Sequence, residues 1–323
     1  WLPVGVPGAT DDVVIDVPAA ISVNFTTGTA TINSLECAET LNLNGGTLIL
    51  STVANVTGTI AMNGGTMQGG TWTLANPLTA SSNSGNRLVG VTVNGDMVLS
   101  AASASLRFAD FLTVNGQVVV SGANARLAAE GSATLNAEVI LQGTSGLNNR
   151  TLGFWGAGAE QTLTLGPSTV VRGSGIAIVG SLFGAAGGTK LVVNQGLISG
   201  ELAGQTLTLS SFSNLSNEGT IHAVAGTVSI QSASWTSSGT QIVESGAALV
   251  LGGNFTTSSL GTFVSNGGSV DFTGNLDNTA STLTLDGGTG SWTLNGGTMM
   301  GGTVALTRGA MLSASSNSGN RLV

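Results

Sequence analysis

Residues able to do acid–base, nucleophilic or metal chemistry are few in this chain and far apart. There is one histidine, His222, in the segment GTIHAVAG, and one cysteine, Cys37. A Ser-His-Asp triad needs an aspartate beside the histidine, and no aspartate lies within 40 residues of His222 in the sequence. We expect His222 to lie on the surface of a strand and Cys37 to be a small buried residue. One histidine and one cysteine also argue against a structural zinc site.

The acidic residues give a weak indication of calcium and none of catalysis. Asp11 and Asp12 are adjacent, and Asp16 lies four positions after Asp12. Calcium takes several oxygen ligands, so these three are weak calcium candidates. Enzymes that cleave polysaccharides need clustered carboxylates, whereas the other acids are scattered. We predict no catalytic residue, no cofactor and no enzymatic activity, and keep a polysaccharide-binding or polysaccharide-cleaving protein as the alternative.

Basic residues recur at nearly regular intervals. Six of the eight are spaced 20, 19, 24, 22 and 18 positions apart, namely Arg87, Arg107, Arg126, Arg150, Arg172 and Lys190. Asp110 and Glu130 follow Arg107 and Arg126 closely. Two interpretations remain open: a basic stripe on one face, able to bind an anionic glycan or an acidic face of a neighbouring fibre, or side chains that point in several directions. Trp155, in GFWGAG, is the best candidate for an exposed ring that stacks on a sugar.

The composition indicates how such side chains are positioned. The chain has 323 residues, of which 50 are glycine and 7% are charged, against about 25% charged residues in an average domain. Threonine, valine, leucine and isoleucine favour strands, and glycine and asparagine favour tight turns. A hydrophobic content of 41% argues against disorder, and a net charge of −8 argues against nucleic-acid binding. No run of about 20 apolar residues predicts a transmembrane helix.

A short period identifies the architecture. The segments TVNGDMVL (92–99), TVNGQVVV (113–120) and TLNAEVIL (134–141) are 21 residues apart. This period is too short for a propeller blade of about 40–45 residues but fits one coil of a solenoid. Strand-like TLTL segments recur at 162–165, 206–209 and 282–285. The sequence therefore predicts an all-β, right-handed parallel β-helix (β-solenoid) with about 15 rungs of roughly 18–24 residues.

The domain organisation follows from prolines and from a long-range repeat. Residues 1–20 contain three of the five prolines and are predicted to be a unit start or partial N-terminal cap. Residues 21–323 are predicted to form one continuous solenoid. The segment 63–89 recurs at 295–323, with both copies ending in SSNSGNRLV. We therefore expect the chain to be part of a longer repetitive protein, cut inside a repeat.

Three segments, GATDDVVIDVP (8–18), INSL (32–35) and ETLNLNGGTLIL (39–50), resemble the openings of repeat units in very large bacterial surface proteins. These are parallel β-helix exoproteins of the filamentous-haemagglutinin type and autotransporter passengers. The resemblance implies an extracellular or cell-surface location and a structural, non-catalytic role in a fibre or stalk-like adhesin. The implied partners are further copies of the repeat, joined head to tail or laterally, and cell-surface glycans.

Overall fold

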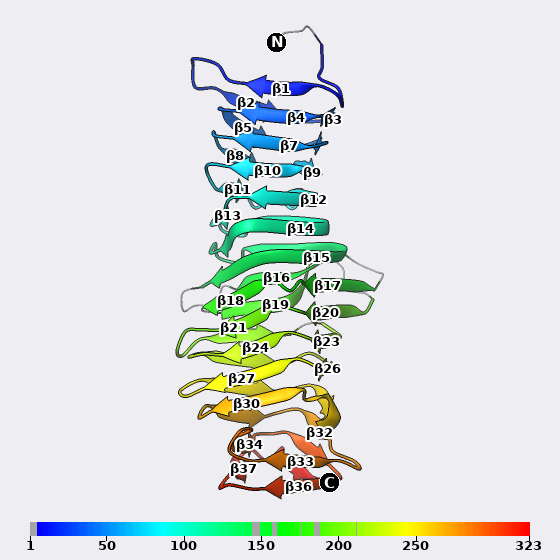
Figure 1. Ribbon diagram of the computed structural model, residues 1–323, viewed down its shortest axis with the longest axis vertical. Coiled ribbons are helices and arrows are strands. Elements are labelled where there is room, and N and C mark those ends of the chain that lie inside the picture. Colours follow the sequence, from blue (N-terminus) through cyan, green and yellow to red (C-terminus); the bar gives the residue numbers. More distant parts are fainter. Residues whose placement is uncertain (1–4, 144–148, 157–159, 175, 184–187, 211) are drawn as a thin grey trace.

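The protein is a β-solenoid of about 14 turns, in which the strands are parallel and stacked along one axis. The computed structural model describes residues 5–143, 149–156, 160–174, 176–183, 188–210 and 212–323. The two ends of the chain lie at opposite ends of an elongated rod (Figure 1). The predicted fold class is therefore confirmed, with one turn fewer than expected. At about 4.8 Å per strand layer, the rod is about 65 Å long.

Each turn contributes one strand to each of three faces, which we number in chain order. Face 1 contains β1 (Asp12–Ile15), β4 (Ser34–Cys37), β7 (Val53–Val56), β10 (Thr71–Leu74), β17 (Gln161–Leu165), β20 (Lys190–Asn194), β23 (Asn214–Asn217), β26 (Ser234–Ser237), β29 (Asn254–Thr256), β32 (Asn275–Asp277), β35 (Thr298–Met300) and β38 (Arg321–Leu322). Face 2 contains β2 (Ser22–Phe25), β5 (Thr40–Leu43), β8 (Ile60–Met62), β11 (Leu78–Ala80), β13 (Met97–Leu99), β18 (Val170–Ser174), β21 (Leu197–Gly200), β24 (Thr220–Ala223), β27 (Thr240–Glu244) and β30 (Thr262–Asn266).

Face 3 contains β3 (Thr29–Ile32), β6 (Thr47–Leu50), β9 (Thr66–Gln68), β16 (Arg150–Trp155), β19 (Ile176–Phe183), β22 (Thr206–Leu209), β25 (Thr227–Ile230), β28 (Ala248–Leu251), β31 (Ser269–Phe272), β34 (Trp292–Leu294) and β37 (Leu312–Ala314). Three long strands bend around corners and serve more than one face: β12 (Arg87–Asn94), β14 (Ser105–Val120) and β15 (Arg126–Gln142). The strands β33 (Thr282–Leu285) and β36 (Thr303–Leu306) form a separate parallel pair, and one short 3₁₀ helix spans Thr257–Ser259.

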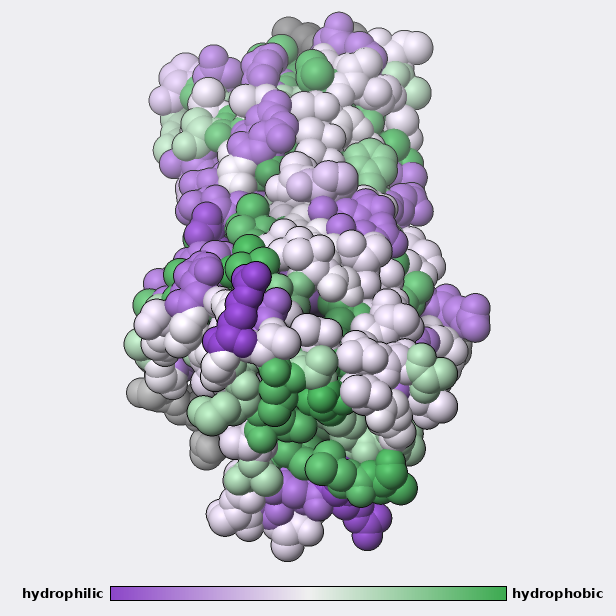
Figure 2. Space-filling model, turned by 60° about the horizontal axis from the view of Figure 1, so that its bottom comes forward, coloured by the Kyte–Doolittle hydropathy of each residue, from purple (hydrophilic) through white to green (hydrophobic). Residues whose placement is uncertain are grey.

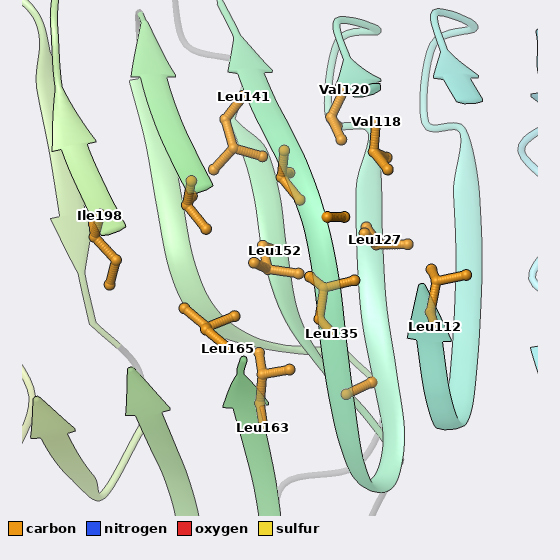
Figure 3. Packing of buried hydrophobic residues seen from close by; sticks show 14 of the residues in the cluster. Leu112, Val118, Val120, Leu127, Leu135, Leu141, Leu152, Leu163, Leu165 and Ile198 are labelled. Atoms are coloured by element: carbon orange, nitrogen blue, oxygen red, sulfur yellow. The ribbon is translucent and has the colours of Figure 1, made fainter. Parts of the chain in front are cut away.

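The core consists of columns of apolar side chains that point inward from alternate strand positions. On face 3, one such column runs through Leu207, Val228, Leu249, Val270 and Trp292, all of which are at most 1% exposed. Figure 3 shows the same inward packing in the middle of the rod. A strand that alternates in this way buries one side against its own rod and leaves the other to water. Since one turn cannot enclose this core alone, each turn depends on its neighbours.

The length of a turn varies more than predicted. Arg87 is paired with Arg107 and Ser105 with Arg126, close to the expected 21 positions. In the middle of the rod, however, Glu138 is paired with Val170, 32 positions later. The predicted range of 18–24 residues is therefore too narrow. The described strands of this long turn nevertheless keep their parallel pairing.

The 21-residue alignment of 92–99, 113–120 and 134–141 holds only in part. Thr92 is paired with Thr113, and the Asn115 side chain donates to Asn94 Oδ1 at 2.7 Å. In the next turn Thr113 is paired with Asn136, which is a shift of two positions. The backbone bulges between Glu130 and Ala133, and this displacement is reversed before Gln117 pairs with Glu138. These asparagines lie within strands, although asparagine favours tight turns.

Glycine and buried asparagine shape the corners where the backbone of one turn lies on the next. A Cβ atom placed on Gly239 would lie 2.0 Å from the carbonyl oxygen of Gly219, which no side chain tolerates. At a nearby corner the buried Asn194 amide donates to Asn217 Oδ1 at 2.7 Å, and the Asn217 amide donates to Ser237 Oγ at 3.0 Å. Such ladders satisfy buried polar groups that would otherwise destabilise the rod.

The two copies of the long repeat form the same corner on different faces. Strand β9 of the first copy belongs to face 3, whereas the matching strand β35 of the second copy belongs to face 1. In both copies an asparagine oxygen accepts from a following glycine, as in Asn83 with Gly85 and Asn317 with Gly319. The corner is therefore a local structure that fits more than one face.

Apolar side chains gather at the C-terminal end of the rod. Leu306, Met311, Leu322 and Val323 are 50–78% exposed, and Figure 2, with this end turned toward the viewer, shows a broad hydrophobic area. Leu88 and Val89, which match Leu322 and Val323 in the first copy, are buried under the following turn. In the part of the chain that the structure describes, no helix is long and apolar enough to cross a membrane.

Candidate functional site

Two arginines lie directly opposite each other on face 3. Arg87 in β12 is paired with Arg107 in β14, the next strand along the rod. In the preceding turns the same column holds Thr29, Thr47 and Thr66. Threonine is well suited to an outward-facing position in a strand. The fold therefore does not require arginine at this position. Two unit charges about 5 Å apart repel each other by about 1 kcal/mol even in water.

Glu130 in β15 offsets this repulsion. Its Oε2 atom lies 2.8 Å from Arg87 Nε and 3.4 Å from Arg107 NH1. The side chains of Arg87 and Glu130 are each 31% exposed and that of Arg107 is 18% exposed, so the group is half-buried and reachable from solvent. One carboxylate oxygen thus holds two guanidinium groups, which limits their motion without cancelling their joint charge.

Trp155 at the end of β16 completes the group. Its ring centroid lies 5.2 Å from Arg107 Cζ and 5.5 Å from Arg126 Cζ. Trp155 is paired with Glu130 in β15, so its ring crosses β15 to reach Arg107 in β14. The small Ala128 occupies the position of β15 next to Arg107. We call Arg87, Arg107, Arg126, Glu130 and Trp155 the arginine–tryptophan cluster.

The arginines of this cluster are held differently. Arg126 Nε donates to Ser105 Oγ at 3.1 Å, and burial lowers the pKa of Arg126 from its ordinary value. Arg107 Nε is buried and has no hydrogen-bond partner. Stacking against an aromatic ring and contact with a carboxylate both fix a guanidinium group in one orientation. The cluster therefore presents three oriented cations on three consecutive turns.

The other three residues of the predicted basic series do not join the arginine–tryptophan cluster. Arg150 is 8% exposed and its Nε and NH2 atoms donate to Ser121 O at 3.0 and 2.8 Å. Lys190 is 1% exposed at the start of β20, opposite Gln161 on face 1. Arg172 lies on face 2. The structure therefore divides the six residues: Arg150 is one position out of register with Arg126, whose partner is Thr151, and longer turns bring Arg172 and Lys190 to faces 2 and 1.

Arg172 belongs to a separate ionic group. Its Nε lies 2.7 Å from Glu138 Oε1, and its NH1 lies 2.5 Å from Glu201 Oε1. These contacts, first of all the hydrogen bond that Arg172 donates to Glu138, raise the pKa of Arg172. With two carboxylates for one guanidinium, this group is acidic overall and does not extend a basic surface.

The single histidine and the single cysteine lie far from the arginine–tryptophan cluster in sequence. His222 is in β24, with Nε2 3.0 Å from Glu244 Oε1 in the adjacent strand β27. Cys37 is 2% exposed, and burial raises the pKa of its thiol. Their positions agree with the expectation of a strand-surface histidine and a buried cysteine.

The three aspartates predicted as weak calcium ligands lie in β1 or next to its ends. Asp12 Oδ1 accepts from Ser34 Oγ at 2.5 Å and from Asn33 Nδ2 at 2.7 Å, and these bonds lower the pKa of Asp12. Asp11 Oδ2 accepts from the Gly8 amide at 2.7 Å, and Asp16 follows the end of β1. Among the described residues, no three acidic, histidine or cysteine side chains are grouped so as to hold a metal ion.

Comparison with known proteins identifies no relative of this chain. No protein-family model, curated protein or solved structure matches the chain. The assignment of any role therefore depends on the residues and on the rod that positions them.

Sequence reasoning missed the partner of Arg87. Glu130 is 43 residues away, two turns along the chain, whereas the prediction considered acids three or four residues after each arginine. A search at twice the 21-residue period would have found it, because residues two turns apart on one face remain within reach of long side chains.

Proposed function

We propose that this chain is a structural, non-catalytic segment of a long extracellular fibre or stalk-like adhesin. The observation that supports this role is the stacking of parallel strands from β1 to β38 around one core. A rod of this kind can be extended by adding further turns, since each turn repeats the same backbone contacts with its neighbours. The resemblance of residues 8–18 and 39–50 to repeats of bacterial surface proteins supports the same role.

The proposal includes association between copies of the repeat. Strand β38 and its neighbouring apolar side chains, Leu306, Met311 and Leu322, offer an edge on which a further parallel turn can stack. Unpaired strand edges are templates for added strands. Stacking of this end on the N-terminal end of another copy is a head-to-tail contact, which produces an open filament rather than a closed ring.

Electron microscopy of the purified chain and of a tandem dimer of residues 1–323 tests the rod and its continuation. We expect straight particles about 65 Å long for the single chain and about twice that length for the dimer, with no bend at the junction. Globular particles, or two rods joined by a flexible hinge, would contradict a continuous stalk.

The extracellular location needs its own test. An antibody against the chain should label intact cells of the organism that encodes it and should also detect filaments released from them by shear. Labelling confined to permeabilised cells would contradict both the location and the adhesive role.

A further inference from the structure

We propose that the arginine–tryptophan cluster on face 3 is a binding site for an acidic polysaccharide, whose carboxylate or sulfate groups the arginines recognise. This inference goes beyond the fibre role. A rod can bear load without any ligand, so loss of binding would leave the structural proposal intact.

The first argument is the concentration of positive charge. Three of the eight basic residues in a chain of net charge −8 meet in one place, and one carboxylate, that of Glu130, is bonded to two of them. Asp110, the other acid near in sequence, has its carboxylate beside Gly90. Guanidinium groups bind carboxylate and sulfate oxygens through paired N–H donors. The cluster is therefore a local cationic site on an acidic protein.

The second argument is that the fold does not need these side chains. The column that holds Arg87 and Arg107 carries threonine in three preceding turns. The arginines thus introduce a repulsion that Glu130 and Trp155 then offset. An arrangement that holds like charges together at a half-buried surface, with a single carboxylate between two of them, leaves net positive charge for an anion to neutralise.

The third argument is the match to a linear polymer of sugars. Arg87 and Arg107 are paired on consecutive strands, so they follow the rod axis about 5 Å apart, and Arg126 on the next strand lies opposite Ser105, two positions to the side of Arg107. Trp155 adds a large, half-buried aromatic ring beside them. Aromatic rings pack against the apolar faces of sugars, whereas an acidic peptide needs the cations alone. These features favour an acidic polysaccharide over an acidic protein.

Binding of the purified chain to immobilised polysaccharides tests the proposal. The probes are heparin for sulfate groups, alginate for carboxylate groups and dextran as the neutral control, all at about 0.15 M salt, where weak surface attraction is screened. We expect binding to heparin, to alginate or to both, and none to dextran. The preferred polyanion then identifies the anionic group. Failure to bind either polyanion would overturn the proposal.

Variants locate the site. Arg107→Gln and Arg126→Gln should each weaken binding about tenfold, since each removes charge-assisted hydrogen bonds. Trp155→Leu should weaken it as well, and Glu130→Gln should strengthen it because a competing carboxylate is lost. Arg172→Gln removes the same charge from face 2 and is the matched control, with an expected change below about twofold.

Two results would count against a specific site. An equal loss of binding in Arg172→Gln and Arg107→Gln would indicate attraction by overall charge. Binding of poly-glutamate as tight as that of the polysaccharides, and unaffected by Trp155→Leu, would assign the cluster to acidic protein instead. Circular dichroism and thermal melting of each variant separate loss of binding from loss of fold, and Arg126→Gln provides the answer if Arg107→Gln does not fold.

Discussion

Asn86 and Asn320 form the same hydrogen bonds 234 positions apart, on different faces of the rod. Each side-chain oxygen accepts from a glycine amide of the preceding turn, Gly64 or Gly296, and each amide donates to a serine carbonyl five residues earlier. Asn86 makes one further bond, to Ser105 O at 3.0 Å in the following turn, and is completely buried. The asparagine thus bonds to the turns on both sides of it.

A first prediction concerns the following turn, to which Asn86 bonds in the first copy and which Val323 lacks in the second. A copy of residues 90–121 added after Val323 should stack on β38 as the original stacks on β12. Burial of Leu322 and Val323 would then contribute about 1.5–3 kcal/mol each. Hydrogen exchange of residues 298–323 should slow markedly. The same residues added in scrambled order are the control, and equal protection by both extensions would contradict a sequence-specific stacking surface.

A second prediction concerns the glycine corners. Gly239→Ala should destabilise the protein by about 3 kcal/mol, because the new methyl group would overlap the Gly219 carbonyl oxygen and push two turns apart. Gly287→Ala is the control, since a Cβ there would meet no atom within 4 Å. Urea unfolding followed by circular dichroism measures both. Similar midpoints for the two variants would show that the corner can relax.

A third prediction separates buried from exposed asparagine ladders. Asn217→Ala removes the acceptor of the Asn194 amide and the donor to Ser237, inside the rod, and should cost about 2 kcal/mol. Asn115→Ala removes an exposed bond to Asn94 and should change stability by less than about 0.5 kcal/mol. Thermal melting of both variants tests this contrast, which a uniform effect would refute.

A fourth prediction concerns acid. Hydrogen bonds from His222 and Asn266 lower the pKa of Glu244 below its ordinary value of 4.5. The unfolded chain therefore binds a proton at a higher pH than the folded chain does. The stabilisation is present above about pH 4.5 and is lost as the pH falls through the folded-state pKa. Urea midpoints measured between about pH 6 and pH 3 should decrease, and less steeply in Glu244→Gln. An unchanged slope in that variant would exclude this pair as a contributor.

The fold was accessible from sequence because its signal is repeated many times. The TLTL segments at 162–165, 206–209 and 282–285 all lie in strands, within β17, β22 and β33. Alternation of threonine and leucine fixes which side chain faces the core, whatever the length of the loops between strands. One misjudged loop therefore does not change the fold class.

The candidate site was less accessible, because it depends on the loops. A stripe on one face would have placed Arg150 and Lys190 in line with Arg126, whereas Arg150 is buried one position from Thr151, the partner of Arg126, and Lys190 is buried on face 1. Their spacing in sequence is close to one turn only if every turn has the same length. Glu130 and Trp155 enter the site through a backbone bulge and through a strand pairing between β15 and β16, neither of which the local composition specifies.

The displacement of the repeat by one face has a geometric consequence for any longer array. If the 234-residue unit were duplicated, the second copy of the arginine–tryptophan cluster would lie further along the rod. It would also be rotated about a third of the way around the rod axis. Three successive units would then present the cluster in three directions, in a helical arrangement around the rod axis. A stalk built in this way could engage its surroundings from every side, and a neighbour lying along one side would meet the same cluster again only at every third unit.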